Sequence, residues 1–546
     1  MQLGVCWYPE QWPEAWWADD ARRMRELGIA WVRIAEFAWA VIEPEPGRLE
    51  WGWLDRAIAA LHAEGLKVVL GTPTATPPKW LVDAHPEILA VDAHGRPRGF
   101  GSRRHYCFSS PVYRELSARI VRGMAERYGR HPAVAAWQTD NEYGCHDTVL
   151  SDSAAARAGF RAWLRTGHPD IPAFHHDLYR GMRCGAGSGT AGRWWVMEQQ
   201  PGPVNWAPWN PAPADGMVRL WTWQAFAHGA EVVSYFRWRQ APFAQEQMHA
   251  GLNRPDRALD QGGAEAAQVA EEVRALLDGA APAPLAVRPR VALVFDYASH
   301  WMGEIQPQGA DYSVIHECFR AYSALRGLAL DVDVLPVDAD LSGHALVVLP
   351  ALLHVPERLA QALAAGAAQV VVGARGGSKT ARLSIAEPLP PGPLATLLGL
   401  QVTRVESLSP GVVEPAALAD GSGTLAMRGW RERLALAGAV VEARHADDGS
   451  PALTRHGRAR YLAGCTDVAG WTAVLSRAAA DAGLATEALP EGLRVSRAGG
   501  LVVALKLDDQ PVHWQPTEAA TARLGGAALP PRGVAVWQLA DAAKPT

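Results

Sequence analysis

The chain has 546 residues and an ordinary globular composition, in which 49% of residues are hydrophobic and 20% are charged. This length exceeds what one hydrophobic core normally supports, so we expect two or more domains. The formal net charge of −5 excludes the strong basic field that attracts nucleic acid. No apolar run reaches the roughly 20 residues of a membrane span. We therefore expect a cytoplasmic protein with neither nucleic-acid nor membrane partners.

The first 240 residues alternate between strand-like and helix-like segments. This alternation is typical of parallel βα units and predicts a (β/α)8-type barrel over residues 1–282. Helices are predicted between Pro13 and Gly28 and over Leu54–Glu64, Ser109–Arg127 and Gly216–Gly229. The predicted strands are Leu3–Tyr8, Trp31–Phe37, Lys67–Gly71, Val134–Asp140, Trp194–Glu198 and Glu231–Trp238.

The predicted barrel is short of two βα units between residues 150 and 193. A helix is predicted over Ser153–Leu164, whereas the polar and Gly-rich stretch 165–193 contains no convincing strand. Strand number, tilt and shear are linked in a closed barrel. The two strands that flank the gap therefore either become neighbours or leave an opening with two exposed edges.

A second α/β domain is predicted over residues 288–487, after a linker at Leu276–Pro289. We expect a doubly wound domain that resembles the flavodoxin and class I amidotransferase folds. Its segment Val370–Gly376 lacks a Gly-x-Cys-x-Gly elbow and is therefore interpreted as structural. Residues 488–546 are predicted to form a small β domain. The predicted elements are Val291–Asp296, Tyr312–Arg326, Leu330–Pro336, Ala345–Leu349, Val370–Gly373, Leu501–Leu507 and Val534–Leu539.

Two glutamates follow predicted barrel strands. Glu142 ends the sequence Thr-Asp-Asn-Glu, and Glu198 follows an apolar run. Active sites of these barrels lie at the C-terminal ends of the strands. Two carboxylates there are the minimum requirement for glycoside hydrolysis, in which one protonates the leaving oxygen and the other attacks the sugar or activates water. The alternative is that each glutamate is an ordinary surface or helix N-terminal carboxylate.

Seven stretches follow one another in the chain and together carry a family resemblance. They are GVCWYPEQWP, WVRIAEFAWAVIEPEPG, RRHYC, WQTDNEYGCHDT, WWVMEQQPGPVNWAP, GMVRLWTWQAFAHGA and YFRWRQAPFAQEQMHAGL. With these stretches the chain resembles the β-galactosidases of glycoside hydrolase family 42 over essentially its whole length. The resemblance implies a retaining hydrolase that acts on terminal non-reducing β-D-galactosides without a cofactor. It also implies a homotrimer, assembled through the middle domain, whose partners are β-galactoside oligosaccharides.

The resemblance also implies a role for each site residue. Glu142 corresponds to the general acid/base, Glu198 to the nucleophile, and Asn141 to the amide that binds the sugar 2-hydroxyl. The remaining correspondences are Arg33 and Arg103 as orienting groups, Glu246 and His249 as ligands of the far hydroxyls, and Trp206 and Phe236 as aromatic walls.

Simpler interpretations of these residues stay open. Arg33 could neutralise Glu36, Glu246 and His249 could form a helical surface pair, and the aromatic residues could belong to the core. His175, His176 and Asp177 are interpreted as a surface turn and not as metal ligands. Only Cys107 and Cys145 lie in the region where some family members carry a cysteine cluster for zinc, so we predict no metal.

Three functions are therefore considered. The first is an active retaining β-galactosidase. The second is a catalytically impaired relative with a carbohydrate-binding or assembly role, because of the missing barrel segment. The third is an α-L-arabinopyranosidase, since that sugar differs from galactose mainly at one exocyclic carbon.

Overall fold

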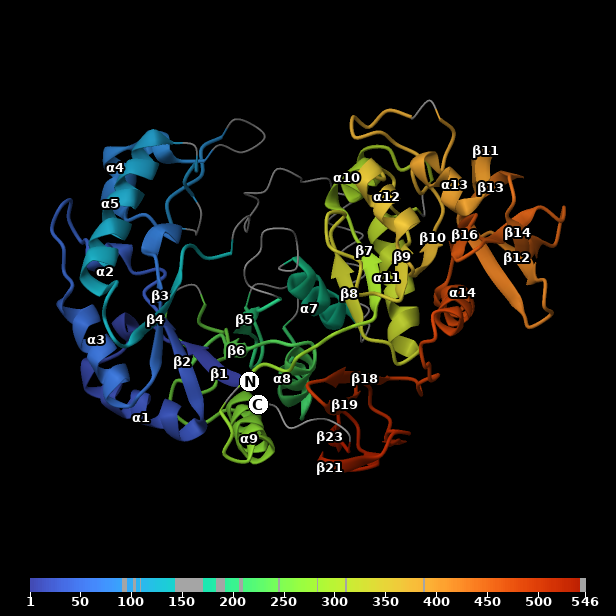
Figure 1. Cartoon of the computed structure of the whole chain (residues 1–546). Coiled ribbons are helices and arrows are strands. Elements are labelled where there is room, and N and C mark those ends of the chain that lie inside the picture. Colours follow the sequence, from blue (N-terminus) through green and yellow to red (C-terminus); the bar gives the residue numbers. More distant parts are fainter. Residues whose placement is uncertain are drawn as a thin grey trace. The chain divides into compact units, whose positions relative to one another are not determined.

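The computed structural model divides the chain into two compact units (Figure 1). Unit 1 contains Met1–Arg161, Trp195–Phe226 and Glu231–Pro284, and unit 2 contains Ala162–Trp194, Ala227–Ala230 and Leu285–Thr546. None of the helices in the described part of the chain is long and apolar enough to cross a membrane. The structure describes residues 1–90, 96–101, 105–108, 110–142, 170–182, 192–205, 210–243, 246–281, 283–309, 312–385 and 388–540.

Unit 1 is built on a parallel sheet whose six strands are those predicted from the sequence. Their order is β4-β3-β2-β1-β6-β5, and every neighbouring pair is parallel. The sheet thus contains six strands of a barrel-type arrangement. The strands are β1 (Gln2–Cys6), β2 (Ile29–Ile34), β3 (Lys67–Gly71), β4 (Val134–Gln138), β5 (Trp195–Gln199) and β6 (Val232–Tyr235).

The two outer strands of this sheet do not pair with each other. Among the described residues, β4 pairs only with β3, and β5 pairs only with β6. Every residue of β5 is half-buried, whereas every residue of β6 is buried. The described parts of β4 and β5 are therefore not neighbours in the sheet. That two whole βα units are missing stays a prediction, and the predicted helix Ser153–Leu164 lies outside the described residues.

The end of α1 and the beginning of α5 show how particular residues fix the helices of unit 1. α1 ends at Gly28, whose φ of 92° suits glycine and whose missing Cβ also avoids Ala270 of α9. α5 begins after Ser110, whose hydroxyl accepts a hydrogen bond from the Tyr113 amide. The helices are α1 (Trp17–Leu27), α2 (Trp39–Ile42), α3 (Gly52–Ala63), α4 (Lys79–Ala84), α5 (Pro111–Tyr128), α8 (Met217–Ala227, whose last residue falls in unit 2) and α9 (Gln261–Leu277).

Unit 2 contains an 11-stranded mixed sheet. Its parallel part, β8-β7-β9-β10-β16, has the second strand outside the first, as in flavodoxin-like folds, and includes the strands predicted for this domain. These strands are β7 (Val291–Val294), β8 (Val332–Leu335), β9 (Leu346–Leu349), β10 (Gln369–Val372) and β16 (Ala459–Leu462).

The predicted doubly wound arrangement describes only the parallel part of this sheet, because antiparallel strands extend it. Of these strands, β11 was missed because it is mostly exposed and so lacks a continuous apolar run. The added strands are β11 (Leu400–Ser407), β12 (Val413–Leu418), β13 (Thr424–Leu436), β14 (Val440–His445), β15 (Pro451–His456) and β17 (Gly464–Thr466). The helices of this region are α10 (Tyr297–Ile305), α11 (Val314–Gly327), α12 (Glu357–Ala365), α13 (Ala395–Leu398) and α14 (Val468–Asp481).

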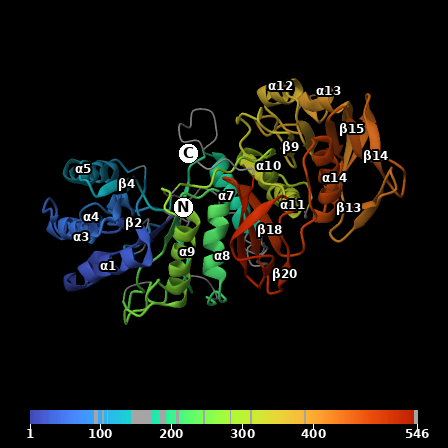
Figure 2. The ribbon, with the colours of Figure 1, turned by 60° about the horizontal axis from the view of Figure 1, so that its bottom comes forward.

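Small antiparallel sheets follow the large one in unit 2. Trp514 and Trp537 meet in their core with ring centroids 5.6 Å apart. Figure 2 shows β18 near α11, and the Arg326 guanidinium joins the two by donating to the Val495 carbonyl and the Ser496 hydroxyl, both at 2.8 Å. The strands are β18 (Leu493–Ala498), β19 (Leu501–Lys506), β21 (Ala520–Leu524) and β23 (Val534–Leu539), with β20 (Val512–His513) paired to β22 (Ala528–Leu529).

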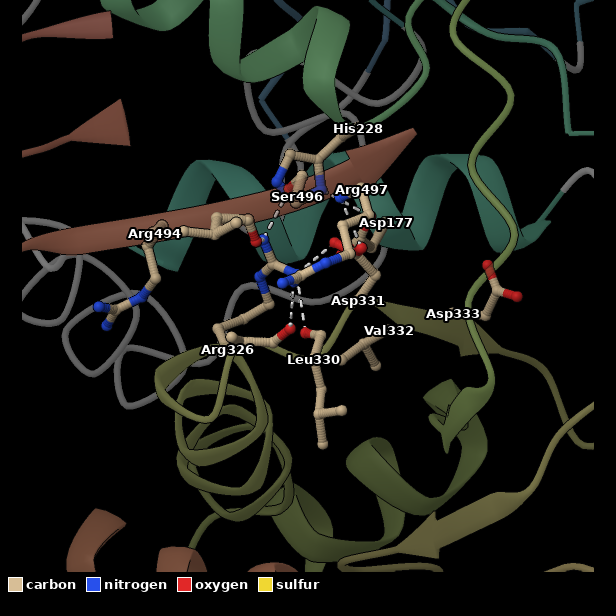
Figure 3. A network of polar contacts seen from close by, with 12 residues as sticks. Asp177, His228, Arg326, Leu330, Asp331, Val332, Asp333, Arg494, Ser496 and Arg497 are labelled. Carbon is tan, nitrogen blue, oxygen red and sulfur yellow. Dashed lines mark hydrogen bonds and ion pairs between the residues drawn. The ribbon is translucent and has the colours of Figure 1, made fainter. Parts of the chain in front are cut away.

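Helix α7 (Asp170–Met182) corrects the interpretation of residues 175–177 as a surface turn. Its apolar face enters the core of unit 2 through Ile171, Phe174 and Leu178. Asp177 is buried and accepts hydrogen bonds from Arg180 at 2.5 Å, His228 Nδ1 at 2.7 Å and Tyr322 Oη at 2.6 Å. Figure 3 shows Asp177 and His228 beside the contacts of Arg326. The spacing of the three apolar residues was the helical signal that the polar composition concealed.

Candidate active site

Three strands of unit 1 bring polar side chains to their C-terminal ends. Arg33 lies near the end of β2, Gln138 ends β4, and Glu198 lies near the end of β5. The Arg33 Nη1 donates to Gln138 Oε1 at 3.0 Å and to Asn141 Oδ1 at 3.4 Å, and its Nη2 donates to Glu198 Oε1. The predicted site residues Arg33, Asn141 and Glu198 are thus in direct contact.

Arg33 also contacts a carboxylate that was not predicted to be a site residue. Its Nη2 lies 2.8 Å from Glu36 Oε1, and the same oxygen accepts a hydrogen bond from Tyr8 Oη at 2.7 Å. Arg33 and Glu36 are 1% and 0% exposed, so their charges are almost fully removed from water. The interpretation that Arg33 neutralises Glu36 is therefore correct but incomplete, because Arg33 binds Glu36 and Glu198 together.

The backbone explains how Glu36 reaches this position. β2 ends at Ile34 because Ala35 takes a φ of 76°, which turns the chain before Glu36. On β3, Gly71 faces this turn, and an added Cβ there would lie 2.6 Å from the Glu36 Cβ and 2.9 Å from its Cα. Glu36 therefore fits because residue 71 has no side chain.

The charge state of Glu198 reflects opposing neighbours. Burial raises the pKa of its carboxyl, the Arg33 guanidinium lowers it, and the negative charges of Glu142 and Glu36 raise it further, with a net shift upward. The Glu198 side chain is still 20% exposed, so it is open to a ligand. An interacting pair of carboxylates, one of them partly open to solvent, is suited to proton and glycosyl transfer.

An aromatic group lies beside this charged cluster. Tyr8 packs against Phe37 and Phe236, each with ring centroids 6.0 Å apart, and Phe236 lies 4.8 Å from the His249 ring. Phe236 is only 2% exposed, so it supports its neighbours more than it offers a free surface.

Glu246 and His249 are held by residues of the segment after β5 and of the segment after β6. The His249 Nε2 lies 2.6 Å from Gln200 Oε1, and Arg237 lies 3.5 Å from the Glu246 carboxylate and donates to its carbonyl at 2.9 Å. His249 is buried, which a helical surface pair would not be.

Three residues named in the sequence analysis, Arg103, Trp206 and Cys145, lie outside the described part of the chain.

Several polar residues of the site were not predicted. One of them is Glu10, whose pKa is raised to about 8 by burial together with the charge of Glu36. Within the described ranges, no three His, Cys, Asp or Glu side chains are grouped closely enough to hold a metal ion. The unpredicted residues are Tyr8, Glu10, Glu36, Gln138, Gln200 and Arg237, and only strand-end position could have signalled Gln138 and Gln200.

Comparisons with known proteins identify the family. The family model of glycoside hydrolase family 42, described as β-galactosidase, matches residues 6–173 and 165–276, and the model of a β-galactosidase trimerisation domain matches 289–485. A β-galactosidase of Thermus thermophilus is 47% identical over 660 aligned residues, which cover 98% of this chain and 100% of that protein.

Solved structures agree with these matches. The β-galactosidase of the psychrophilic Marinomonas ef1 has a TM-score of 0.90 and 40% identity, covering 99% of this chain and 100% of that one. The β-galactosidase of the Antarctic haloarchaeon Halorubrum lacusprofundi has a TM-score of 0.86 and 33% identity, and the match covers 98% of this chain and 99% of that one. The chain therefore belongs to glycoside hydrolase family 42.

Proposed function

We propose that the chain is a retaining β-galactosidase that hydrolyses terminal non-reducing β-D-galactosides, with Glu198 as nucleophile and Glu142 as general acid/base. The observation that carries this proposal is the position of Glu198, held by Arg33 at the strand ends and close enough to Glu142 for its charge to act on the Glu198 carboxyl. The names of the relatives at 47% and 40% identity support the choice of substrate.

In the first step, a Glu198 oxygen attacks the anomeric carbon and the bond to the leaving oxygen breaks. Glu142 gives its proton to that oxygen, so the aglycone departs as an alcohol. The product is a galactosyl ester of Glu198, and the carboxylate has lost its charge. Glu142 is then ionised beside a neutral ester.

In the second step, water attacks the anomeric carbon while Glu142 takes one of its protons. The ester bond breaks, galactose leaves with its β configuration, and Glu198 recovers its negative charge. Asn141, fixed by Gln138 Nε2 at 3.2 Å and by Arg33, is proposed to bind the 2-hydroxyl. Glu246 and His249 are proposed to bind the far hydroxyls, Arg103 to orient the sugar, and Trp206 and Phe236 to form its aromatic walls.

The proposed organisation is a catalytic domain over 1–282, a trimerisation domain over 288–487 and a small β domain over 488–546. The family match of residues 289–485 to a trimerisation domain supports a homotrimer. The missing barrel segment is supported by length, since the 660 aligned positions exceed the 546 residues of this chain by 114. We further propose a cytoplasmic location and β-galactoside oligosaccharides as substrates.

One observation favours an impaired relative as the second candidate. β5 carries Glu198 and β4 precedes Glu142, yet within the described residues each strand pairs on one side only. A misplacement of about 1 Å can reduce a rate on the order of a hundredfold. An opening at this point of the sheet could therefore preserve the residues and lose the rate.

The test is hydrolysis of nitrophenyl β-D-galactopyranoside and nitrophenyl α-L-arabinopyranoside by the purified chain. We expect turnover of the galactoside, its loss in Glu198→Gln, and a smaller loss in Glu142→Gln, because nitrophenolate leaves without a proton. Glu43→Gln is the control, since Glu43 is a carboxylate of the same unit that bonds Trp39 and Arg119 instead of Arg33. A folded parent that hydrolyses neither substrate would support the impaired relative, and faster turnover of the arabinoside would support the arabinopyranosidase.

A further inference from the structure

We propose that Glu36 is a positioning residue that stays as the counter-ion of Arg33 while Glu198 gives up its charge to the sugar. This inference rests on the proposed function, because it assigns a role to Glu36 within the same double displacement.

The geometry makes Arg33 a shared cation. One nitrogen, Nη2, contacts both Glu36 Oε1 and Glu198 Oε1, while Nη1 is occupied by Gln138 and Asn141. Two carboxylates on one nitrogen must share a single positive charge. Arg33 therefore stabilises ionised Glu198 less than it would as that residue's exclusive partner.

The sharing matters when Glu198 becomes an ester. The galactosyl ester is neutral, so a guanidinium paired only with Glu198 would then be buried without a counter-charge, which is strongly unfavourable. In the proposal, Glu36, which is 0% exposed and lies 2.8 Å from Arg33, supplies that counter-charge in the intermediate. The ion pair between Arg33 and Glu36 therefore persists through both steps.

The surroundings hold Glu36 in place for this role. Tyr8 Oη donates to the oxygen that contacts Arg33, and the Glu36 Oε2 is buried with no hydrogen-bond partner among the described residues. The turn at Ala35 and the absence of a side chain at Gly71 fix the backbone of Glu36. In the described part of the chain, Arg33 is the one ion-pair partner of Glu36.

The ionisable groups that act on Glu198 come from four elements. Arg33 and Glu36 come from β2 and the turn after it, Glu142 follows β4, and Cys6 is on β1. The Cys6 Sγ lies 3.7 Å from the Met197 carbonyl, and burial raises the pKa of its thiol, so it stays neutral at working pH. Glu36 is therefore the anion besides Glu142 that tunes Glu198.

The test compares the titration of Glu198 in the parent and in Glu36→Gln. The full-length protein is labelled with carbon-13 at glutamate Cδ, and Glu198→Gln identifies the Glu198 signal. We expect Glu36→Gln to lower the Glu198 midpoint by on the order of one pH unit, because one neighbouring negative charge is removed. The acid limb of the pH profile of kcat/KM should move to lower pH by the same amount. Formation of the ester should be slower on the order of tenfold, because Arg33 then stabilises the ionised Glu198 more strongly.

Two variants keep the test decisive. Tyr8→Phe removes a hydrogen-bond donor from Glu36. Arg33 then interacts more strongly with Glu36 and less strongly with Glu198, so the titration midpoint of Glu198 should rise. Glu43→Gln removes a buried carboxylate that does not contact Arg33, so the midpoint should not move. A Glu198 midpoint that is unchanged or raised in Glu36→Gln would overturn the proposal. A silent parent whose Glu198 midpoint still falls in Glu36→Gln would overturn the proposed function and, with it, the role of Glu36 in the reaction, and would leave only the electrostatic coupling of the two carboxyls.

Discussion

Each unit contains a buried ionic cluster, and the two clusters differ in the ratio of carboxylates to hydrogen-bond donors. In the Asp177 cluster of unit 2, one carboxylate faces three donors, Arg180, His228 and Tyr322. In the Arg33 cluster of unit 1, one guanidinium faces two carboxylates, Glu36 and Glu198.

The balance decides the charge state of each carboxyl. Burial would raise the pKa of Asp177, but Arg180 and His228 reverse the effect and hold that pKa well below its usual range. Burial also raises the pKa of Glu198, and Arg33, shared with Glu36, does not cancel the rise. A carboxylate with surplus donors stabilises a fold, whereas one that must share its cation keeps a raised pKa, as is common at functional sites.

Removing the charge of Asp177 should give the largest effect on stability. Asp177→Asn removes one of the two carboxylates that Arg180 contacts and leaves Asp333 at 3.1 Å, so we expect the free energy of unfolding to fall by about 1.5–3 kcal/mol. Chemical denaturation followed by circular dichroism measures this loss. Asp338→Asn is the control, because Asp338 is 46% exposed and 3.9 Å from Arg358, and it should match the parent. Equal stabilities of the two variants would show that the Asp177 cluster does not stabilise unit 2.

Replacing Arg33 by lysine tests whether the site needs the geometry of the cation or only its charge. Lysine keeps the positive charge but cannot contact Gln138, Asn141, Glu36 and Glu198 together. We expect kcat/KM to fall on the order of a hundredfold, about 2.7 kcal/mol in the barrier, with little change in the folded fraction. The comparison is Arg127→Lys, which alters an exposed bidentate pair with Asp55 and should keep full activity. Full activity in Arg33→Lys would show that the site needs only the positive charge and not the geometry of the guanidinium.

A smaller effect is expected from Gly71→Ala. The new Cβ would lie 2.6 Å from the Glu36 Cβ, so the turn that carries Glu36 must shift by a few tenths of an ångström or more. We expect kcat/KM to fall about tenfold, or about 1.4 kcal/mol. Gly99→Ala meets no atom within 4 Å and should behave like the parent. If both variants keep full activity, the position of Glu36 does not matter to the rate.

The smallest effect is the pH dependence of the Asp177 contribution. The pKa of Asp177 is lower in the folded protein than its ordinary value of 3.8, so its stabilisation is fully present above that value. It is lost as the pH falls through the folded pKa. The difference in unfolding free energy between the parent and Asp177→Asn should therefore be constant from pH 5 to 8 and shrink below about pH 4. A difference that grows on acidification would contradict the assignment.

The sequence predicted the strands of unit 1 well because buried parallel strands are short apolar runs, and β3 coincides with its predicted range Lys67–Gly71. It placed the end of β2 three residues too late, since the turn at Ala35 depends on the contact between Glu36 and Gly71. That same contact hid Glu36 as a site residue. Helix α7 was missed because the buried Asp177 is satisfied by partners far away in the sequence, such as Tyr322.

The most direct test of the account is the anomeric configuration of products formed when azide replaces each catalytic carboxylate. In Glu198→Gly, azide should enter from the face of the missing nucleophile and give the α-galactosyl azide. In Glu142→Gly, azide should attack the ester of Glu198 and give the β-galactosyl azide. Proton NMR distinguishes the two anomers. The reverse pattern, or the same anomer from both variants of an active parent, would contradict the roles assigned to Glu142 and Glu198.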